Sequence, residues 1–199
     1  LPSRNYFTDE IRRQLSLTFG EEEFFTGGMT VRSTFDPLLQ RKATLALQRG
    51  LEKYDRKQGV WRGTGKRIPF EILNDEIKWQ NSLASLKLPS DINLDGQWIP
   101  AVVLGIENSA VRIGIYGIKE TAKGNWIPRA DISWVKKFLN SGKLIDTSGQ
   151  FSDFLNPGDV VLVRKLYDQD GSFLRWSLRQ VSEVQGAFMA MDVNNGRII

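Results

Sequence analysis

Ser133 and Lys136 have the S-x-x-K spacing of a serine nucleophile and a lysine that can accept its proton. Enzymes that transfer acyl groups in this way also need an S-x-N and a K-S/T-G sequence elsewhere in the chain. Ser3-Arg4-Asn5 fits the S-x-N pattern, but the sequence contains no K-S/T-G. We interpret both matches as chance occurrences of short patterns. We therefore expect no catalytic residue in this chain and no acyl adduct on Ser133.

Two other short patterns have residue types that could do chemistry. Gly63-Thr64-Gly65-Lys66 superficially resembles a phosphate-binding loop, but Val60 replaces the upstream glycine and Arg67 stands where a serine or threonine is needed. We interpret this segment as a turn. The adjacent carboxylates of residues 21–23 are of the kind used in glycoside hydrolysis or metal binding, but such runs are usually solvated.

The composition excludes several kinds of site. The chain of 199 residues has no His and no Cys, which excludes Ser-His-Asp and Cys-His catalysis, disulfides and most zinc sites. We expect no metal and no cofactor. The 27 Lys and Arg residues exceed the 23 Asp and Glu residues by only four, so charge alone does not indicate a nucleic-acid partner.

The N-terminal part of the chain predicts helices, because apolar residues recur there at helical spacing. We expect helices at residues 5–17, 37–54 and 75–86, and a loop at residues 20–28. The second helix follows Asp36-Pro37, a pair that suits a helix N-terminus. One apolar stripe is its predicted packing face: Leu39, Ala43, Leu47, Leu51 and Tyr54.

The pattern changes to β-strands from Trp98 onward. We expect strands at residues 98–106, 109–116, 126–127, 159–167 and 172–181, separated by turn residues. Five short strands of this kind predict a small Greek-key barrel of OB type, with a helical turn or short helix at residues 130–139. The predicted core of this barrel includes Trp98, Val102, Val161, Leu174 and Trp176.

The last predicted hairpin interleaves aromatic and basic residues. Strand alternation places Trp176 toward the core and Phe173, Arg175 and Arg179 on the opposite, solvated face. We consider that face a candidate docking surface for a protein or an anionic glycan polymer. OB folds also bind single strands through aromatic and basic residues, so a single-stranded nucleic-acid-binding protein is the alternative function. We expect a protein partner, or none, rather than nucleic acid.

Two flanking stretches resemble the opening of the transpeptidase domain of penicillin-binding proteins. Residues 27–54 read GGMTVRSTFDPLLQRKATLALQRGLEKY, with a Thr-x-Asp and an LQ, and residues 184–199 read VQGAFMAMDVNNGRII, of the G-A-x-x-A-x-D-x-x-x-G type. Residues 55–182 lie between them. A long insertion at this point resembles the 1A type of class A penicillin-binding proteins, the bifunctional peptidoglycan synthases.

This resemblance implies a mixed α+β fold, in which a small OB-like five-stranded β-barrel is inserted into a transpeptidase domain. Residues 1–26 would be a linker after a glycosyltransferase domain. Residues 27–55 would be the first strand and helix of the transpeptidase domain, residues 56–182 the insert, and residues 183–199 the next strand. We therefore expect residues 29–35 and 186–191 to be neighbouring strands of one sheet, with the 37–54 helix packed on it.

By the same resemblance, the parent synthase polymerises lipid II and cross-links stem peptides through the serine that β-lactams trap. The expected role of this chain is a non-catalytic scaffold at the periplasmic face of the inner membrane of a Gram-negative bacterium. The implied partners are the other domains of the synthase and a protein regulator, which in some relatives is an outer-membrane lipoprotein activator. Membrane contact is expected only through an anchor outside this sequence.

Overall fold

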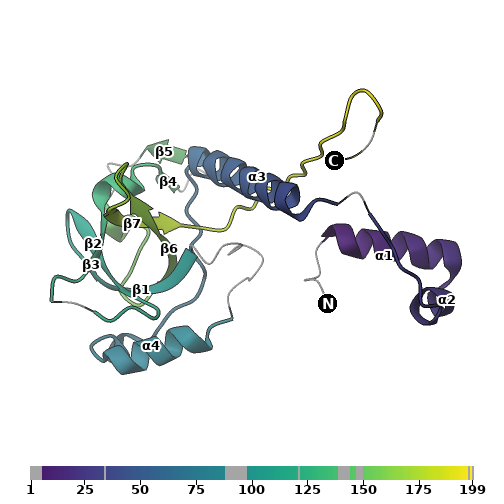
Figure 1. Ribbon diagram of the computed structural model, residues 1–199. Coiled ribbons are helices and arrows are strands. Elements are labelled where there is room, and N and C mark those ends of the chain that lie inside the picture. Colours follow the sequence, from purple (N-terminus) through teal and green to yellow (C-terminus); the bar gives the residue numbers. More distant parts are fainter. Residues whose placement is uncertain are drawn as a thin grey trace. The chain divides into compact units, whose positions relative to one another are not determined.

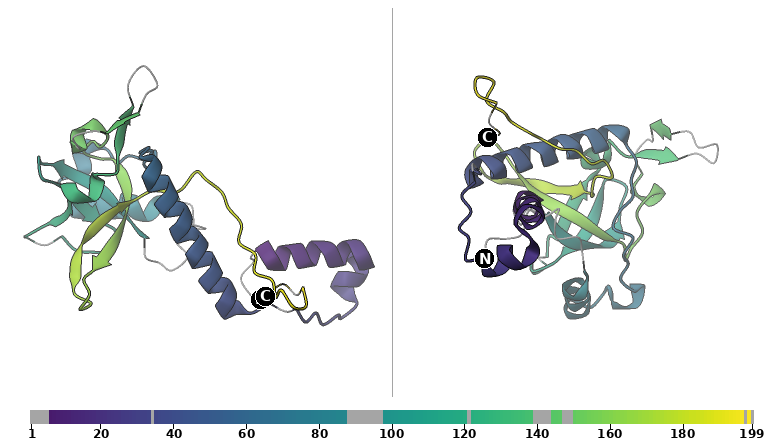
Figure 2. Two further views of the ribbon diagram at one scale, coloured as in Figure 1. Left: turned by 90° about the horizontal axis from the view of Figure 1, so that it is seen from above. Right: turned by 90° about the vertical axis from the view of Figure 1, so that its right-hand side faces the viewer.

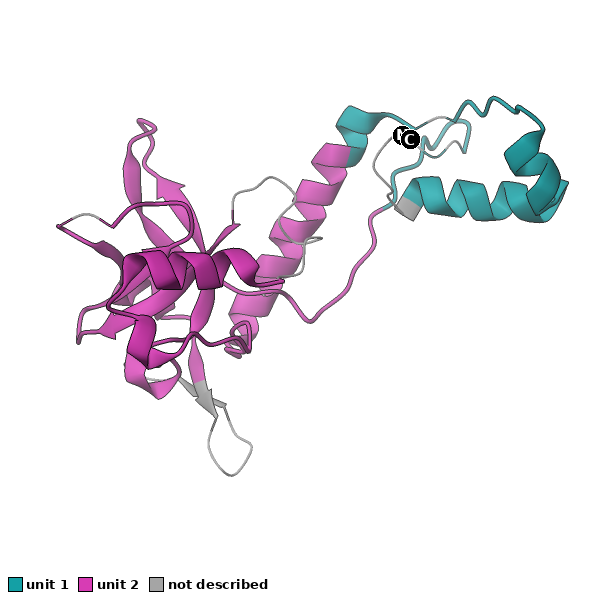
Figure 3. Ribbon diagram, turned by 90° about the horizontal axis from the view of Figure 1, so that it is seen from below, with its two compact units in different colours: residues 1–40, 189–199 teal, residues 41–188 magenta. Residues whose placement is uncertain are grey.

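The computed structural model describes residues 6–33, 35–87, 98–120, 122–138, 144–146, 150–196 and 198. The chain divides into two compact units, residues 1–40 with 189–199, and residues 41–188 (Figure 3). Helix α3, Pro37–Gln58, contributes its first residues to the smaller unit and the remainder to the larger one.

The larger unit contains a curled, five-stranded antiparallel sheet with strand order β3-β2-β1-β6-β7 (Figure 1). The strands are β1 Trp98–Ile106, β2 Ala110–Ile115, β3 Asn125–Pro128, β6 Val160–Tyr167 and β7 Phe173–Arg179. Figure 2 shows the curl of the sheet from two further sides. The curl brings the edge strands together, since the indole N–H of Trp176 in β7 donates to Asn125 Oδ1 in β3 at 3.2 Å. This half-barrel fits an OB-like domain, and all five strands were expected from the sequence.

Short elements connect the strands. They are the 3-10 helices η2 Arg129–Ile132 and η3 Phe151–Asp153, and a small antiparallel pair, β4 Lys136–Phe138 with β5 Leu144–Asp146. A further 3-10 helix, η1 Phe70–Ile72, lies between α3 and α4. The predicted helical turn at residues 130–139 is only η2, because the chain then enters β4, which the sequence did not predict.

The main core lies inside the curled sheet. Its buried members are Ala101, Val103, Val111, Ile113, Ile115, Ile127, Ile132, Val135, Phe151, Leu155, Val161, Val163, Trp176 and Leu178. Trp176 and Val161 are buried as predicted, but the prediction for Leu174 is wrong, since 49% of it is exposed. The register of β7 shifts there: Arg175 pairs with Leu166 and Phe173 pairs with Tyr167, so Leu174 has no partner opposite it and the strict alternation is interrupted.

A second buried cluster lies under helix α4, Glu76–Ser85. The side chain of Asp75 caps this helix by accepting from the N–H of Lys78 at 3.1 Å. Trp79, 1% exposed, lies flat against Gly114 of β2, where a Cβ atom would be 2.8 Å from the indole ring. The cluster comprises Ile68, Leu73, Trp79, Leu83, Val102 and Val160.

Helix α3 does not use its apolar stripe as predicted. Leu39 and Tyr54 are 45% and 53% exposed, while Leu47 and Leu51 lie against Gly186. The helix also continues through Gln58, four residues beyond the predicted end, and those added residues include the buried Asp55. The face of α3 that packs on the sheet is polar.

The smaller unit contains α1 Tyr6–Phe19, close to the predicted helix, and α2 Glu21–Thr26. The prediction of a loop at residues 20–28 is wrong, because residues 21–26 form the helix α2. Its three glutamates occupy the first helical turn, where the helix dipole favours negative charge. The rings of Phe7 and Phe35 stack in this unit with centroids 4.9 Å apart.

The predicted pairing of residues 29–35 with 186–191 is wrong in this chain. The described residues of both segments lie outside strands, apart from an isolated bridge between Met191 and Ile198. A strand-like sequence forms a ladder only where a neighbouring strand satisfies its backbone N–H and C=O groups. Such a neighbour is absent from the described residues around these two segments.

Candidate functional site

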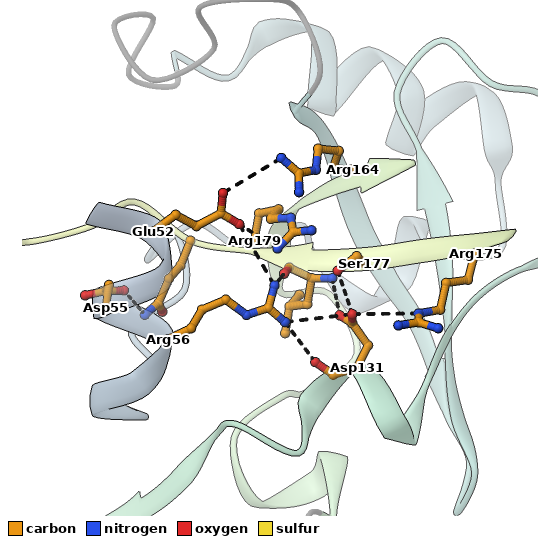
Figure 4. Close-up of polar contacts among 10 residues, drawn as sticks. Glu52, Asp55, Arg56, Asp131, Arg164, Arg175, Ser177 and Arg179 are labelled. Carbon is orange, nitrogen blue, oxygen red and sulfur yellow. Dashed lines mark hydrogen bonds and ion pairs between the residues drawn. The ribbon is translucent and has the colours of Figure 1, made fainter. Parts of the chain in front are cut away.

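A network of charged side chains lies between the last turns of α3 and the outer face of the sheet (Figure 4). Its members come from α3, η2, β6 and β7: Glu52, Asp55, Arg56, Asp131, Arg164, Arg175, Ser177 and Arg179. These elements are distant in sequence, so the folded sheet is what brings the charges together.

Asp131 is the central carboxylate of the network. It is 5% exposed and accepts two hydrogen bonds of 2.6 Å, from the Ser177 hydroxyl and from the N–H of Leu178. The guanidinium groups of Arg56 and Arg175 approach its Oδ1 atom at 3.8 and 4.0 Å. Its oxygens are thus already engaged, which makes Asp131 a structural anchor rather than an available base.

Glu52 on α3 is the second carboxylate. One oxygen contacts Arg179 Nη1 at 2.5 Å and the other lies 3.8 Å from Arg164 Nη1. Burial lowers the pKa of Arg179 to about 10, against the opposing effect of Glu52. Arg179 therefore keeps its charge at neutral pH, and it needs Glu52 because an isolated buried charge is strongly disfavoured.

Arg56 connects the two carboxylates. It lies 4.0 Å from Glu52 Oε1, and it donates to the main-chain carbonyls of Asp131 at 3.1 Å and Leu178 at 3.4 Å. Its guanidinium also lies 5.0 Å from the centre of the Trp134 ring, a cation–π contact. Burial lowers the pKa of Arg56, and the nearby Asp131 and Glu52 act in the opposite direction. Positive and negative groups thus alternate from β6, through α3, to β7.

A second polar contact joins the beginning and the end of the OB-like domain. Asp55 accepts from Arg62 Nη2 at 2.5 Å and from Gln180 Nε2 at 2.7 Å. Gln180 also donates to the carbonyl of Val60 at 2.7 Å and accepts from the N–H of Arg62 at 3.0 Å. We call Asp55, Arg62 and Gln180 the clasp. It fixes the segment that leaves α3 against the segment that leaves β7.

The predicted docking residues do not form one exposed surface. Phe173 is 52% exposed and the Arg175 side chain is 38% exposed, but Arg179 is 5% exposed and bound to Glu52. Ser177, on the same face, is fully buried. The prediction that this face is solvated fails toward the end of β7, because α3 and η2 cover it there.

The other sequence candidates lie apart from the network. Ser133 is exposed and its hydroxyl donates to the carbonyl of Ala130 at 3.2 Å. The glutamates at residues 21–23 are exposed on α2, and Ser3-Arg4-Asn5 lies outside the described residues. Sequence reasoning missed Glu52, Arg56 and Asp131. Only the i, i+4 spacing of Glu52 and Arg56 was visible, and such a pair usually lies on a helix surface.

A metal site and a membrane span are two other kinds of functional feature. In the part of the chain that the structure describes, no group of three acidic residues is placed to hold a metal ion. Among these same residues, no helix combines the length and apolar character needed to span a membrane.

Comparison with known proteins identifies the larger unit's relatives. Residues 61–184 match the family model of the penicillin-binding protein OB-like domain. Penicillin-binding protein 1A of Vibrio cholerae is 30% identical over 195 residues, which is 97% of this chain and 22% of that protein. The proteins of the same name from Rickettsia bellii and Pseudomonas aeruginosa are 32% and 25% identical over 98% and 97% of this chain, and 21% of each relative. The chain thus spans about a fifth of the length of these relatives.

Proposed function

Because this chain belongs to the penicillin-binding proteins that carry the OB-like domain, we propose that it is a non-catalytic scaffold within a bifunctional peptidoglycan synthase. The whole synthase would polymerise glycan strands and cross-link their stem peptides at the periplasmic face of the inner membrane. The observation that carries the proposal is the buried charge network, which holds α3 against the OB-like sheet. A part that sets the position of other domains needs this kind of fixed junction.

The two flanking segments are proposed to belong to a transpeptidase domain that is completed elsewhere in the synthase. Both segments expose apolar side chains: Met29 and Val31 are 39% and 49% exposed, and Phe188 and Met189 are 60% and 65% exposed. Apolar groups gathered on exposed segments favour contact with another surface. The remaining strands of the transpeptidase sheet would supply that contact and a strand ladder, which the described residues of the two segments do not form here.

This proposal predicts a difference in hydrogen exchange between the 199-residue chain and the full-length synthase. Amides of residues 29–35 and 186–191 should become about tenfold or more protected in the full-length protein, because the completed sheet would pair them. The strands of the OB-like sheet are the internal control and should exchange equally in both proteins. Equal, fast exchange of the flanking segments in both proteins would contradict the assignment to a transpeptidase sheet.

We further propose that a protein regulator docks on the tip of the β6–β7 hairpin. Tyr167, Phe173 and Leu174 are 58%, 52% and 49% exposed there, beside the partly exposed Arg175. This surface replaces the one expected from sequence, since it omits the buried Arg179. An exposed apolar and aromatic group is typical of a protein interface.

Oligonucleotide titration separates this proposal from nucleic-acid binding. We expect weak fluorescence-anisotropy changes that vanish at physiological salt, because Trp176 and Arg179 are buried and cannot form a basic, stacking groove. Micromolar binding that survives physiological salt would support the nucleic-acid alternative if Phe173→Ala abolished it. Phe70→Ala, at an aromatic residue elsewhere that is also exposed, is the control.

A further inference from the structure

The glycine-rich segment Trp61 to Arg67 lines a pocket of about 240 Å³, together with Phe154, Leu155 and residues 159–161. This volume is below the roughly 300–1,000 Å³ of pockets that hold drug-sized ligands. It is therefore suited to one small group rather than to an extended ligand. No helix follows this segment directly, so it is not a nucleotide-binding loop.

The segment is held in a defined shape by the beginning of β6. The Thr64 hydroxyl donates to the carbonyl of Val160 at 2.6 Å, and the N–H of Val160 donates to the carbonyl of Lys66 at 2.9 Å. Gly63 and Gly65 have φ angles of 63° and 66°, a left-handed conformation that glycine adopts without strain. Hydrogen bonds to β6 thus fix the backbone that lines the pocket.

Several hydrogen-bond donors of this segment have no protein acceptor. Within the described part of the chain, the N–H groups of Gly63, Thr64 and Gly65 make no hydrogen bond, and the Lys66 ammonium has no acidic partner. Successive N–H groups around left-handed glycines are a common way to bind anions. Gly63 and Thr64 are half-buried and Gly65 is exposed, so these N–H groups are accessible from solvent and available to an anion.

The charges and the wall of the pocket agree with this interpretation. Arg62, Lys66 and Arg67 line it with the carboxylate of Asp159, and the Arg62 guanidinium is already paired with Asp55 in the clasp. Arg67 Nε contacts Asp159 Oδ1 at 2.9 Å, which leaves Lys66 as the uncommitted cation. The rings of Trp61 and Phe154, with centroids 5.7 Å apart, give the pocket an apolar wall.

We propose that this pocket binds one oxyanion, a carboxylate or a phosphate. The donors and Lys66 would hold the charged group, and Trp61 would contact the apolar part of the molecule that carries it. The site rests on its own geometry. Only the choice of a glycan-borne carboxylate as its natural source rests on the proposed function.

The test is an NMR titration of the ¹⁵N-labelled 199-residue chain at constant ionic strength. Its probes are N-acetylmuramic acid, the neutral N-acetylglucosamine, and inorganic phosphate. We expect saturable shifts of the Gly63, Thr64 and Gly65 amides and of the Trp61 indole N–H with N-acetylmuramic acid, and none with the neutral sugar. If phosphate bound more tightly than N-acetylmuramic acid, the oxyanion site would still be supported, and phosphate would be its ligand.

Two lysine variants distinguish a site from general attraction to positive charge. Lys66→Ala should weaken binding by about threefold or more, because it removes the uncommitted cation. Lys123→Ala removes the same charge from an exposed position before β3 and should leave binding unchanged. Equal weakening by both variants, equal shifts with the neutral sugar, or no saturable shift with either anion at millimolar concentrations would overturn the proposal. None of these results depends on the exchange of residues 29–35, which tests the proposed function separately.

Discussion

Replacing Asp131 with alanine should lower the free energy of unfolding by about 3–5 kcal/mol, the cost of removing one partner from a buried ionic network. The change leaves the N–H of Leu178 and the hydroxyl of Ser177 without their acceptor. It also leaves Arg56 and Arg175 beside each other without the carboxylate between them. Urea unfolding of the 199-residue chain, followed by circular dichroism at neutral pH, measures the effect.

Glu107→Ala is the matched control for this prediction. Glu107 is an exposed acidic residue whose side chain makes no hydrogen bond or ion pair among the described residues, so its loss should change stability by about 0.5 kcal/mol or less. A double-mutant cycle with Arg56→Ala should give a coupling energy of about 0.5–3 kcal/mol. If Asp131→Ala costs no more than Glu107→Ala, the network does not anchor α3 to the sheet.

Trp176→Ala should cost about 3–5 kcal/mol of unfolding free energy, as expected for a large aromatic residue removed from a core. Trp176 is 4% exposed, and its ring lies 5.4 Å from the Lys165 ammonium on the neighbouring strand. Its indole N–H also makes the β7-to-β3 hydrogen bond at the closing edge of the sheet. The substitution therefore creates a cavity and removes a contact that curls the sheet.

Leu174→Ala gives the comparison for Trp176. Both residues were assigned to the core from sequence, but Leu174 is 49% exposed at the irregular position of β7. Its truncation should change the unfolding free energy by about 0.5 kcal/mol or less. Similar losses for the two variants, measured by the same urea unfolding, would mean that the structure misplaces the register of β7.

Much of the β-structure could be predicted because it depends on local patterns. Alternating apolar residues and turn residues such as Pro157-Gly158 lie close together in sequence and set where each strand begins and ends. The helix at Pro37–Gln58 was likewise indicated by Asp36, whose side chain caps it through the N–H groups of Leu38 and Leu39. These signals need no information about distant residues.

The polar face of α3 could not be predicted, because its partners lie far away in sequence. Glu52 and Arg179 are 127 residues apart, and Arg56 and Asp131 are 75 apart. An apolar stripe on a helix is usually its packing face, but here only Leu47 and Leu51 of the stripe contact Gly186, and the face packed on the sheet is polar. The same limit explains Ser177 and Arg179, whose burial depends on α3 and η2 covering the end of β7.

The predicted strand pairing of the two flanking segments was wrong for a different reason. Residues 29–33 have good strand alternation, yet alternation describes only which side chains share a face. A ladder also needs a neighbour to accept and donate its backbone hydrogen bonds. The candidate site residues also divide into those with a local signal and those without one. The exposure of Phe173 could be predicted from its own strand, whereas the role of Asp131 depends on residues that only the fold brings near it.

The clasp has a consequence for how the OB-like domain could fold during synthesis. Its contact between Asp55 and Gln180 joins residues 125 positions apart. Closing a flexible chain of that length costs about 4 kcal/mol of entropy. The clasp lies within the same compact unit as the sheet. The interactions that fold this unit therefore offset the entropy lost on closing the chain. The segments that enter and leave the OB-like sheet would then be held side by side, so the folded domain would span the chain as a short loop does.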